Sequence, residues 1–145
     1  MRQERDAGRT RFLGVSNVSL RHLQEMAAGR AELPAFVQNR CYARLGWDRA
    51  VRLFCRERKI IYQGFSLLTA NQEVLRHPVI ARLTTASLAA SANVTPAQVV
   101  FSFARTLGIL PLTGTSDREH MQQDLASRDL TLPLDAVHAI ESLAG

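Results

Sequence analysis

The most constraining feature of this sequence is a unit that occurs four times. Each unit is a short apolar run that ends in polar residues and precedes a helical pattern. The runs have the length and apolar content of buried strands, and they span residues 10–17, 34–40, 60–66 and 109–113. Strands that alternate with helices are typical of parallel sheets with right-handed crossovers. The sequence therefore predicts an α/β fold with four parallel strands and flanking helices.

Start and stop signals delimit the helices between these strands. Ser19 is a suitable N-cap for a helix over residues 20–28, which Gly29 would end. Thr95 as N-cap, with Pro96 at the first helical position and Gln98 at the third, begins a helix that runs over residues 97–107. The remaining helices are expected over residues 47–58, 71–75, 79–92, 117–126 and 133–143.

Length and composition indicate one globular domain over residues 1–145, with 46% hydrophobic and 21% charged residues. There is no apolar run of membrane-spanning length and no apolar segment at the start of the sequence. We therefore expect a cytoplasmic protein without a membrane partner. Cys41 and Cys55 lack metal-ligand spacing, so they are expected to be reduced thiols, and no metal site is predicted.

The formal net charge of +5 is unevenly distributed. Residues 1–60 carry 13 basic and 6 acidic side chains, whereas residues 61–145 carry 5 and 7. A basic segment favours phosphate-bearing ligands. However, its arginines lie beside Asp and Glu without interleaved exposed aromatics, which is typical of a solvated helix face. We therefore predict no nucleic-acid partner.

Five segments of the chain resemble, in order and spacing, the aldo-keto reductases. They are Gly14-Val15-Ser16-Asn17, residues 34–39 (PAFVQN), residues 54–68 (FCRERKIIYQGFSLL), residues 95–101 (TPAQVVF), and residues 111–116 (PLTGTS) followed by His120. The resemblance covers nearly the whole chain, but it corresponds only to the second half of the family's barrel. It implies half of a (β/α)8 TIM-type barrel, with a site where the carboxyl ends of the strands meet.

The resemblance also implies a binding site for NADP(H) on these residues. Ser16, Asn17 and Gln38 match the positions that hold the nicotinamide carboxamide, and Phe65 matches the aromatic that stacks on the nicotinamide ring. Taken alone, a buried Asn or Gln at a strand end more often satisfies backbone groups. Ser66 and Leu67 match the start of the loop that wraps the cofactor pyrophosphate.

The adenosine end of the cofactor would lie further along the chain. Thr113, Gly114, Thr115 and Ser116 precede a helix and match the segment that takes the 2′-phosphate, and His120, Gln123 and Asp124 match contacts around it. Many family members have a Lys beside the position of Gly114 and an Arg at the position of His120. This chain has neither, although Arg118 is close in sequence. The resemblance therefore implies a weakened selectivity for NADP over NAD.

No catalytic residue is predicted in this chain. The family uses a Tyr acid tuned by a Lys and an Asp, with an orienting His, and those motifs belong to the first half of the barrel. Tyr42, Tyr62 and Lys59 lie in other motifs, with no carboxylate at a suitable spacing. Cys41, just after the second strand, is a weak candidate thiol nucleophile. We therefore expect a truncated aldo-keto-reductase-like protein that is not an autonomous carbonyl reductase.

Half a barrel would leave two strand edges unpaired, at residues 10–17 and 109–113, and would expose an apolar inner face. We therefore expect a homodimer with a two-fold axis, or a second half-barrel chain as partner. Two other functions remain open at this point. One is a repurposed non-redox enzyme for a small molecule, such as a cyclase, isomerase or dehydratase, and the other is a non-catalytic interaction protein.

Overall fold

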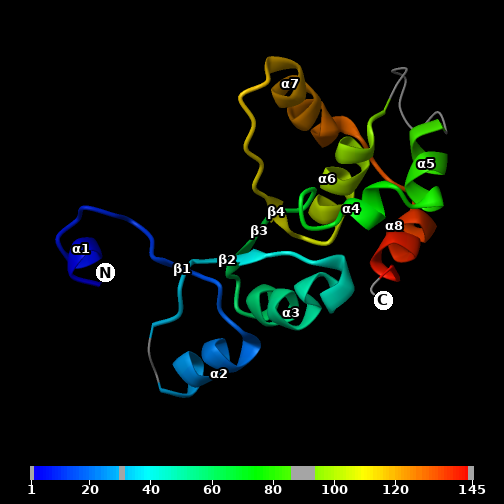
Figure 1. The fold of residues 1–145 in the computed structure, drawn as a ribbon. Helices are drawn as coiled ribbons and strands as arrows, with labels where there is room; N and C mark the ends of the chain where they lie inside the picture. The colour runs from blue at the N-terminus through cyan, green and yellow to red at the C-terminus, as the bar shows by residue number, and fades with distance from the viewer. Residues whose placement is uncertain (1, 30–31, 86–93, 144–145) are drawn as a thin grey trace.

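The computed structural model describes residues 2–29, 32–85 and 94–143. Its centre is a sheet of four parallel strands in the order β1-β2-β3-β4 (Figure 1). The strands are β1 (Gly14–Ser16), β2 (Phe36–Arg40), β3 (Ile61–Phe65) and β4 (Leu110–Pro111). This arrangement confirms the predicted fold class and the four parallel strands.

The first and last strands are shorter than the sequence predicted. Residues 10–13 are not strand, because within the described part of the chain β1 pairs with β2 alone, and this pairing begins where Phe36 lies opposite Gly14. At the other edge, β4 pairs with β3 only through Leu110 and Pro111. Both edges of the sheet are therefore short, and β1 and β4 each have one side that no described strand pairs with.

Eight α-helices surround or extend from this sheet within the described residues. Thr95 forms the predicted capping box with Gln98, and Ser19, predicted as an N-cap, also forms a capping box, with His22. The helices are α1 (Arg2–Asp6), α2 (Leu20–Ala28), α3 (Arg49–Glu57), α4 (Gln72–Leu75), α5 (Pro78–Thr85), α6 (Pro96–Thr106), α7 (Arg118–Ala126) and α8 (Leu134–Glu141), with 3-10 turns η1 (Ala43–Asp48) and η2 (Ser127–Asp129). Residues 86–92 of the helix predicted over 79–92 lie outside the described residues.

The helix predicted to begin at Trp47 begins two residues later. Gly46, Trp47 and Asp48 have φ values of 68°, 55° and 55°, which an α-helix cannot contain. The three residues form a left-handed turn between η1 and α3. Arg52 Nε donates to the carbonyl oxygen of Trp47 at 2.7 Å and helps to hold this turn.

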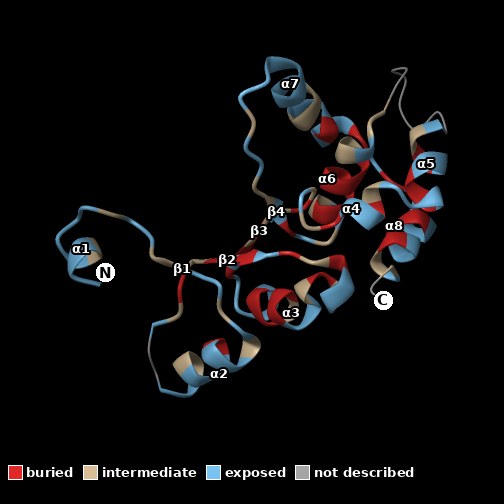
Figure 2. Cartoon of the chain, viewed as in Figure 1, coloured by how far each residue is buried: buried red, intermediate tan, exposed pale blue. Residues whose placement is uncertain are grey.

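The two faces of the sheet are unlike each other. The outer face bears Val37, Asn39, Tyr62 and Gly64, which are buried beneath the helices (Figure 2). A Cβ at Gly64 would lie 2.8 Å from Ile109 Cγ2, so this packing requires glycine. Under these helices lies one continuous core that includes Trp47 and Phe103, whose ring centroids are 4.8 Å apart.

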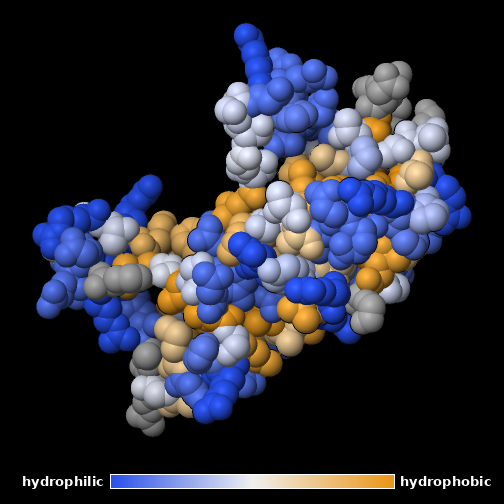
Figure 3. Space-filling view, viewed as in Figure 1, coloured by the Kyte–Doolittle hydropathy of each residue, from blue (hydrophilic) through white to orange (hydrophobic). Residues whose placement is uncertain are grey.

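The inner face bears the alternate strand residues and has no covering layer within the described residues. It consists of Gly14, Ser16, Phe36, Gln38, Arg40, Ile61, Gln63, Phe65 and Leu110. Ile61 and Leu110 are each 46% exposed, and apolar surface is visible along the middle of the molecule (Figure 3). The inner face is less apolar than we expected. The row of residues that lie side by side across its middle is Ser16, Gln38, Gln63 and Leu110, and three of these four are polar.

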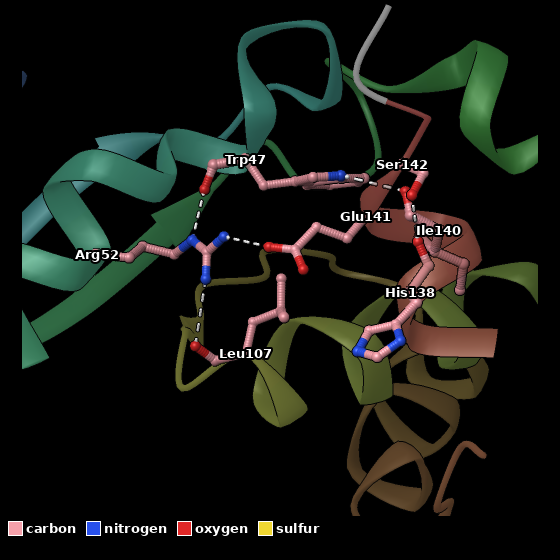
Figure 4. A network of polar contacts seen from close by, with 7 residues as sticks. All are labelled: Trp47, Arg52, Leu107, His138, Ile140, Glu141 and Ser142. Atoms are coloured by element: carbon pink, nitrogen blue, oxygen red, sulfur yellow. Dashed lines mark hydrogen bonds and ion pairs between the residues drawn. The ribbon is translucent and has the colours of Figure 1, made fainter. Parts of the chain in front are cut away.

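A buried polar network joins the last helix to the rest of the fold (Figure 4). The guanidinium of Arg52 pairs with Glu141 on α8 at 3.0 Å and also donates to the carbonyl oxygen of Leu107 at 3.4 Å. Trp47 Nε1 donates to the carbonyl oxygen of Ile140 at 3.4 Å. These bonds connect η1, α3, the end of α6 and α8.

Among the described residues, none of the helices has both the length and the apolar character needed to cross a membrane.

Candidate functional site

A cleft of about 520 Å³ opens where the carboxyl ends of the strands meet, and we call it the rim cleft. Parallel α/β folds place their binding sites at this end of the strands. The cleft gathers side chains from three strand ends, from the loop after β3, and from α6. Its lining is Ser16, Gln38, Phe65, Ser66, Leu67, Leu68, Thr69, Phe101, Leu112, Thr113 and Gly114.

The strand ends supply a flat ring and two polar side chains. Ser16 Oγ donates to the carbonyl oxygen of Gln38 at 2.9 Å, which fixes the hydroxyl and leaves its lone pairs toward other donors. The side-chain amide of Gln38 makes no hydrogen bond to any residue that the structure describes. Phe65 is partly exposed in the same cleft. An unbonded side-chain amide beside a partly exposed ring suits a ligand that is planar and carries hydrogen-bonding groups.

The loop after β3 presents backbone donors to the rim cleft. Ser66 has a φ of 57°, and the N–H groups of Leu67, Leu68 and Thr69 have no acceptor among the described residues. Consecutive N–H groups in such a turn form a concave site for an anion. The predicted anion-binding role of Ser66 and Leu67 therefore fits the local geometry.

Asn71 holds this loop in place, a role that the sequence pattern did not predict. The side chain is fully buried. Its Oδ1 accepts the N–H of Ala43 at 2.7 Å, and its Nδ2 donates to the carbonyl oxygens of Cys41 and Leu67, both at 2.9 Å. One amide thus joins the loop after β3 to the loop after β2. Asn71 is a positioning residue for the rim cleft.

Asn17 lies outside the rim cleft, although Ser16 lines it. Asn17 has a φ of 55° and lines a separate cleft of about 290 Å³, which we call the side cleft. The side cleft is bounded by Asn17, Val18, Ser19, Asn39, Arg40, Tyr42, Leu45 and Asp48. The structure therefore brings Ser16 and Gln38 together and turns Asn17 toward different neighbours.

The segment predicted for the adenosine end is divided between the cleft and α7. Thr113 and Gly114 line the rim cleft, and Thr113 Oγ1 donates to Asp124 at 2.5 Å. Thr115 Oγ1 accepts the N–H of Asp117 at 3.1 Å. Ser116, His120 and Gln123 do not line the cleft, and Gln123 donates to Glu119 at 3.1 Å.

A carboxylate occupies the N-terminus of α7. Asp117 accepts the N–H of His120 at 3.0 Å, and this bond holds the pKa of Asp117 below its usual range. The helix dipole favours an anion at this end, and Asp117 already supplies one. A phosphate would therefore meet repulsion from Asp117 as well as attraction from Arg118.

Tyr62 does have a carboxylate partner, contrary to the sequence-based expectation. Its hydroxyl donates to Asp48 Oδ2 at 2.8 Å, and Asn39 Nδ2 donates to the same oxygen at 2.8 Å. The left-handed turn at Trp47 and Asp48 directs this carboxylate back against the sheet. The pair lies on the outer face, where burial raises the pKa of Tyr62. Neither Tyr62 nor Lys59 lines the rim cleft.

The prediction of Cys41 as a candidate thiol nucleophile is wrong. Cys41 has no exposed surface, and burial raises its pKa from 9.0 to about 12. Cys55 is also buried, and its pKa is raised to about 11. Among the described residues, no three His, Cys, Asp or Glu side chains are grouped so that they could hold a metal ion.

Comparison with known proteins decides the family. Residues 1–144 match the sequence profile of the Aldo/keto reductase family. The chain belongs to this family of oxidoreductases.

The curated relatives are about twice as long as this aldo-keto reductase chain. An uncharacterized oxidoreductase, P32A8.02 of Schizosaccharomyces pombe, is 28% identical over 94% of the chain and 46% of its own length. The methylglyoxal reductase DkgB of Salmonella typhimurium is 27% identical over 94% and 49%. The glycerol 2-dehydrogenase (NADP(+)) of Saccharomyces cerevisiae is 31% identical over 77% and 35%. The chain therefore spans about half the length of the curated relatives.

Solved structures support the same conclusion about the fold. The apo form of Gox0644 superposes with a TM-score of 0.84 over 99% of this chain and 50% of its own, at 22% identity. A variant of Gox0644 in complex with NADPH gives 0.83 over 97% and 49%, at 23% identity. The fold is thus half of an aldo-keto reductase barrel, as the sequence predicted.

Proposed function

We propose that this chain is the cofactor-binding half of an aldo-keto reductase barrel and that its rim cleft binds NADP(H). The observation that carries the proposal is that Phe65, Gln38 and residues 67–69 line one cleft, where the Gln38 side-chain amide and the three backbone N–H groups have no hydrogen-bond partner among the described residues. The names of a relative, glycerol 2-dehydrogenase (NADP(+)), and of the Gox0644 complex with NADPH support it.

The donor set of the rim cleft fits the parts of such a cofactor. Phe65 would stack on the nicotinamide ring, while Ser16 and Gln38 would bind its carboxamide. The N–H groups of residues 67–69 and the Ser66 hydroxyl would bind the pyrophosphate. A bound NADPH supplies a hydride, and these residues orient the ring that carries it.

The adenosine end should discriminate weakly between NADPH and NADH. Asp117 and Asp124 are the acidic residues bonded to this segment, and Arg118 is the exposed basic one. Repulsion from Asp117 offsets much of the attraction that a 2′-phosphate would gain. We expect the two reduced cofactors to differ by less than about tenfold in Kd, or about 1.4 kcal/mol.

The described residues do not place a proton donor in the rim cleft with a tuned pKa. Tyr62 faces the helices, and Tyr42 lines the side cleft. A positioned acid contributes roughly 10² to 10⁴ to the rate of such a reaction. We therefore propose that the 145-residue chain binds the cofactor but does not reduce a carbonyl by itself.

The inner face is proposed to receive a second half-barrel, and we favour a second copy of this chain. A two-fold axis along the barrel would place β4 of each copy beside β1 of the other, keeping all strands parallel. This pairing would satisfy both free strand edges and cover Ile61 and Leu110.

Titration of the chain with NADPH, followed by cofactor fluorescence, tests the proposal. We expect saturable binding, weakened at least tenfold by Phe65→Ala because the stacking surface is lost. Phe12→Ala is the matched control, since Phe12 is 61% exposed but lies outside the rim cleft. Circular dichroism establishes that both variants are folded.

With methylglyoxal as the carbonyl probe, absorbance at 340 nm should stay constant. No saturable binding, or turnover of NADPH, would contradict the proposal.

A further inference from the structure

Two guanidinium groups gather on the ring of Tyr42, which lines the side cleft together with Arg40. The Arg44 Cζ atom lies 5.1 Å from the ring centroid of Tyr42, and the Arg40 Cζ atom lies 6.0 Å from it. Arg40 Nη1 also donates to the Tyr42 hydroxyl at 3.2 Å. We call Arg40, Tyr42 and Arg44 the arginine stack. It combines a hydrogen bond with cation–π contacts, which restrict both side chains.

The arginine stack adjoins the proposed nicotinamide position. Arg40 is the last residue of β2 and pairs in register with Phe65 on β3. The Arg40 Cζ atom lies 5.5 Å from the ring centroid of Phe65. Gln38, two residues earlier on the same face of β2, lines the rim cleft. Arg40 therefore stands at the boundary between the rim cleft and the side cleft.

The charges of this stack are not neutralised by an ion pair. Five other arginines pair with carboxylates, namely Arg5, Arg9, Arg21, Arg52 and Arg58. Arg40 and Arg44 join none of the ion pairs among residues 2–29, 32–85 and 94–143. The carboxylate in the lining of the side cleft is Asp48, and one of its oxygens already accepts from Tyr62 and Asn39.

An arginine held by rings and left without a carboxylate keeps its planar donor fork for a ligand. Each guanidinium has five N–H donors, and Arg40 donates one of them to the Tyr42 hydroxyl. The fork matches the geometry of a carboxylate or phosphate, which it can bind with two parallel hydrogen bonds. The cofactor pyrophosphate already has donors in residues 66–69. The arginine stack therefore remains available to a ligand that binds beside the cofactor.

We propose that the arginine stack binds an anionic group of the ligand in the rim cleft, and that the group is the carboxylate of an oxo-acid substrate. The proposal deepens the proposed function and rests on it. Arg40 makes the direct contact, and Arg44 adds charge and holds Tyr42. The ligand class is a small carbonyl compound whose carboxylate reaches Arg40 while its carbonyl group faces the ring that stacks on Phe65.

Calorimetric titration with pyruvate and with its neutral amide, pyruvamide, measures the preference for charge. Both are titrated with and without saturating NADPH, so that failure of cofactor binding is seen separately. We expect pyruvate to bind at least tenfold more tightly than pyruvamide. Arg40→Met should abolish this ratio, and Arg44→Met should reduce it two- to fourfold. Arg76→Met is the control, because Arg76 is exposed, lies in none of the ion pairs above and lines neither cleft.

A parallel titration with NADPH and with reduced nicotinamide mononucleotide distinguishes the two sources of the anion. If Arg40→Met weakens both nucleotides and leaves the pyruvate ratio unchanged, the anion is a cofactor phosphate and the oxo-acid assignment is overturned. If the variant abolishes only the pyruvate ratio, the assignment holds. Equal affinities of the unmodified chain for pyruvate and pyruvamide would overturn it as well, provided that NADPH binds.

Discussion

The outer and inner faces of the same four strands differ in how completely their side chains are satisfied. On the outer face, the Asn39 amide accepts the N–H of Val18 at 3.0 Å and donates to its carbonyl oxygen at 2.8 Å, and the neighbouring side chains are buried. On the inner face, Ile61 and Leu110 are nearly half exposed, and the side-chain amides of Gln38 and Gln63 make no hydrogen bonds within the described residues. Stability therefore resides in the layer between strands and helices, and the inner face is left for a ligand or a partner.

The largest expected effect follows from removing a side chain of the covered layer. Trp47→Ala should lower the free energy of unfolding by about 3–5 kcal/mol, because a fully buried aromatic leaves a cavity. Urea denaturation followed by circular dichroism measures the change. Leu110→Ala is the control on the inner face, and it should cost less than about 1 kcal/mol in the dissociated chain because that side chain is already half exposed. Similar losses for the two variants would refute the comparison.

A second, smaller effect concerns the two thiols behind the sheet. Burial raises the pKa of Cys41 to about 12 and that of Cys55 to about 11, so the folded chain keeps protons that the unfolded chain releases above pH 9. The contribution of these buried thiols to the free energy of unfolding is fully present below pH 9. It falls as the pH rises toward 11 for Cys55 and 12 for Cys41, by at most about 1.4 kcal/mol per pH unit for each thiol.

Iodoacetamide labelling checks this expectation at pH 8. Both thiols should react only after urea is added, and denaturation midpoints should fall between pH 9 and 11. Rapid labelling of Cys41 in the folded chain would show that the outer face is not sealed.

The smallest effect on unfolding, and the sharpest on association, is expected on the inner face. Leu110→Glu changes an exposed residue, so the separated chain should lose less than about 1 kcal/mol of stability. The carboxylate would be buried between half-barrels, so the dimer should dissociate at micromolar concentration. Sedimentation velocity compares this variant with Leu125→Glu, which alters a 63% exposed residue on α7. A monomeric unmodified chain would refute the second copy as partner.

Local signals predicted most of the fold and part of the site. N-cap signals at Ser19 and Thr95 located two helices, and the resemblance to the aldo-keto reductases singled out Ser16, Gln38 and Phe65, which line one cleft. The rest depended on contacts between distant residues. Asn71 bonds to Cys41 and Ala43 from about thirty positions away, and Asp48 reaches Tyr62 only because the preceding turn is left-handed. No periodicity in the sequence encodes either contact.

The register of the sheet explains why the inward position of Gln63 was not predicted. Gln63 lies within an apolar run, which predicts a buried strand but not which of its residues face inward. Its alignment with Gln38 and Leu110 places it in the middle row of the inner face. Alternation along a five-residue strand is too short a pattern to reveal that row in advance.

The single tryptophan has a practical consequence for spectroscopy. Trp47 is enclosed by Phe103 and bonded to the end of α8, and it lines neither cleft. Its emission therefore senses the docking of the C-terminal helix. Ultraviolet excitation of the indole would follow the melting of that contact while remaining indifferent to an oxo acid at Arg40.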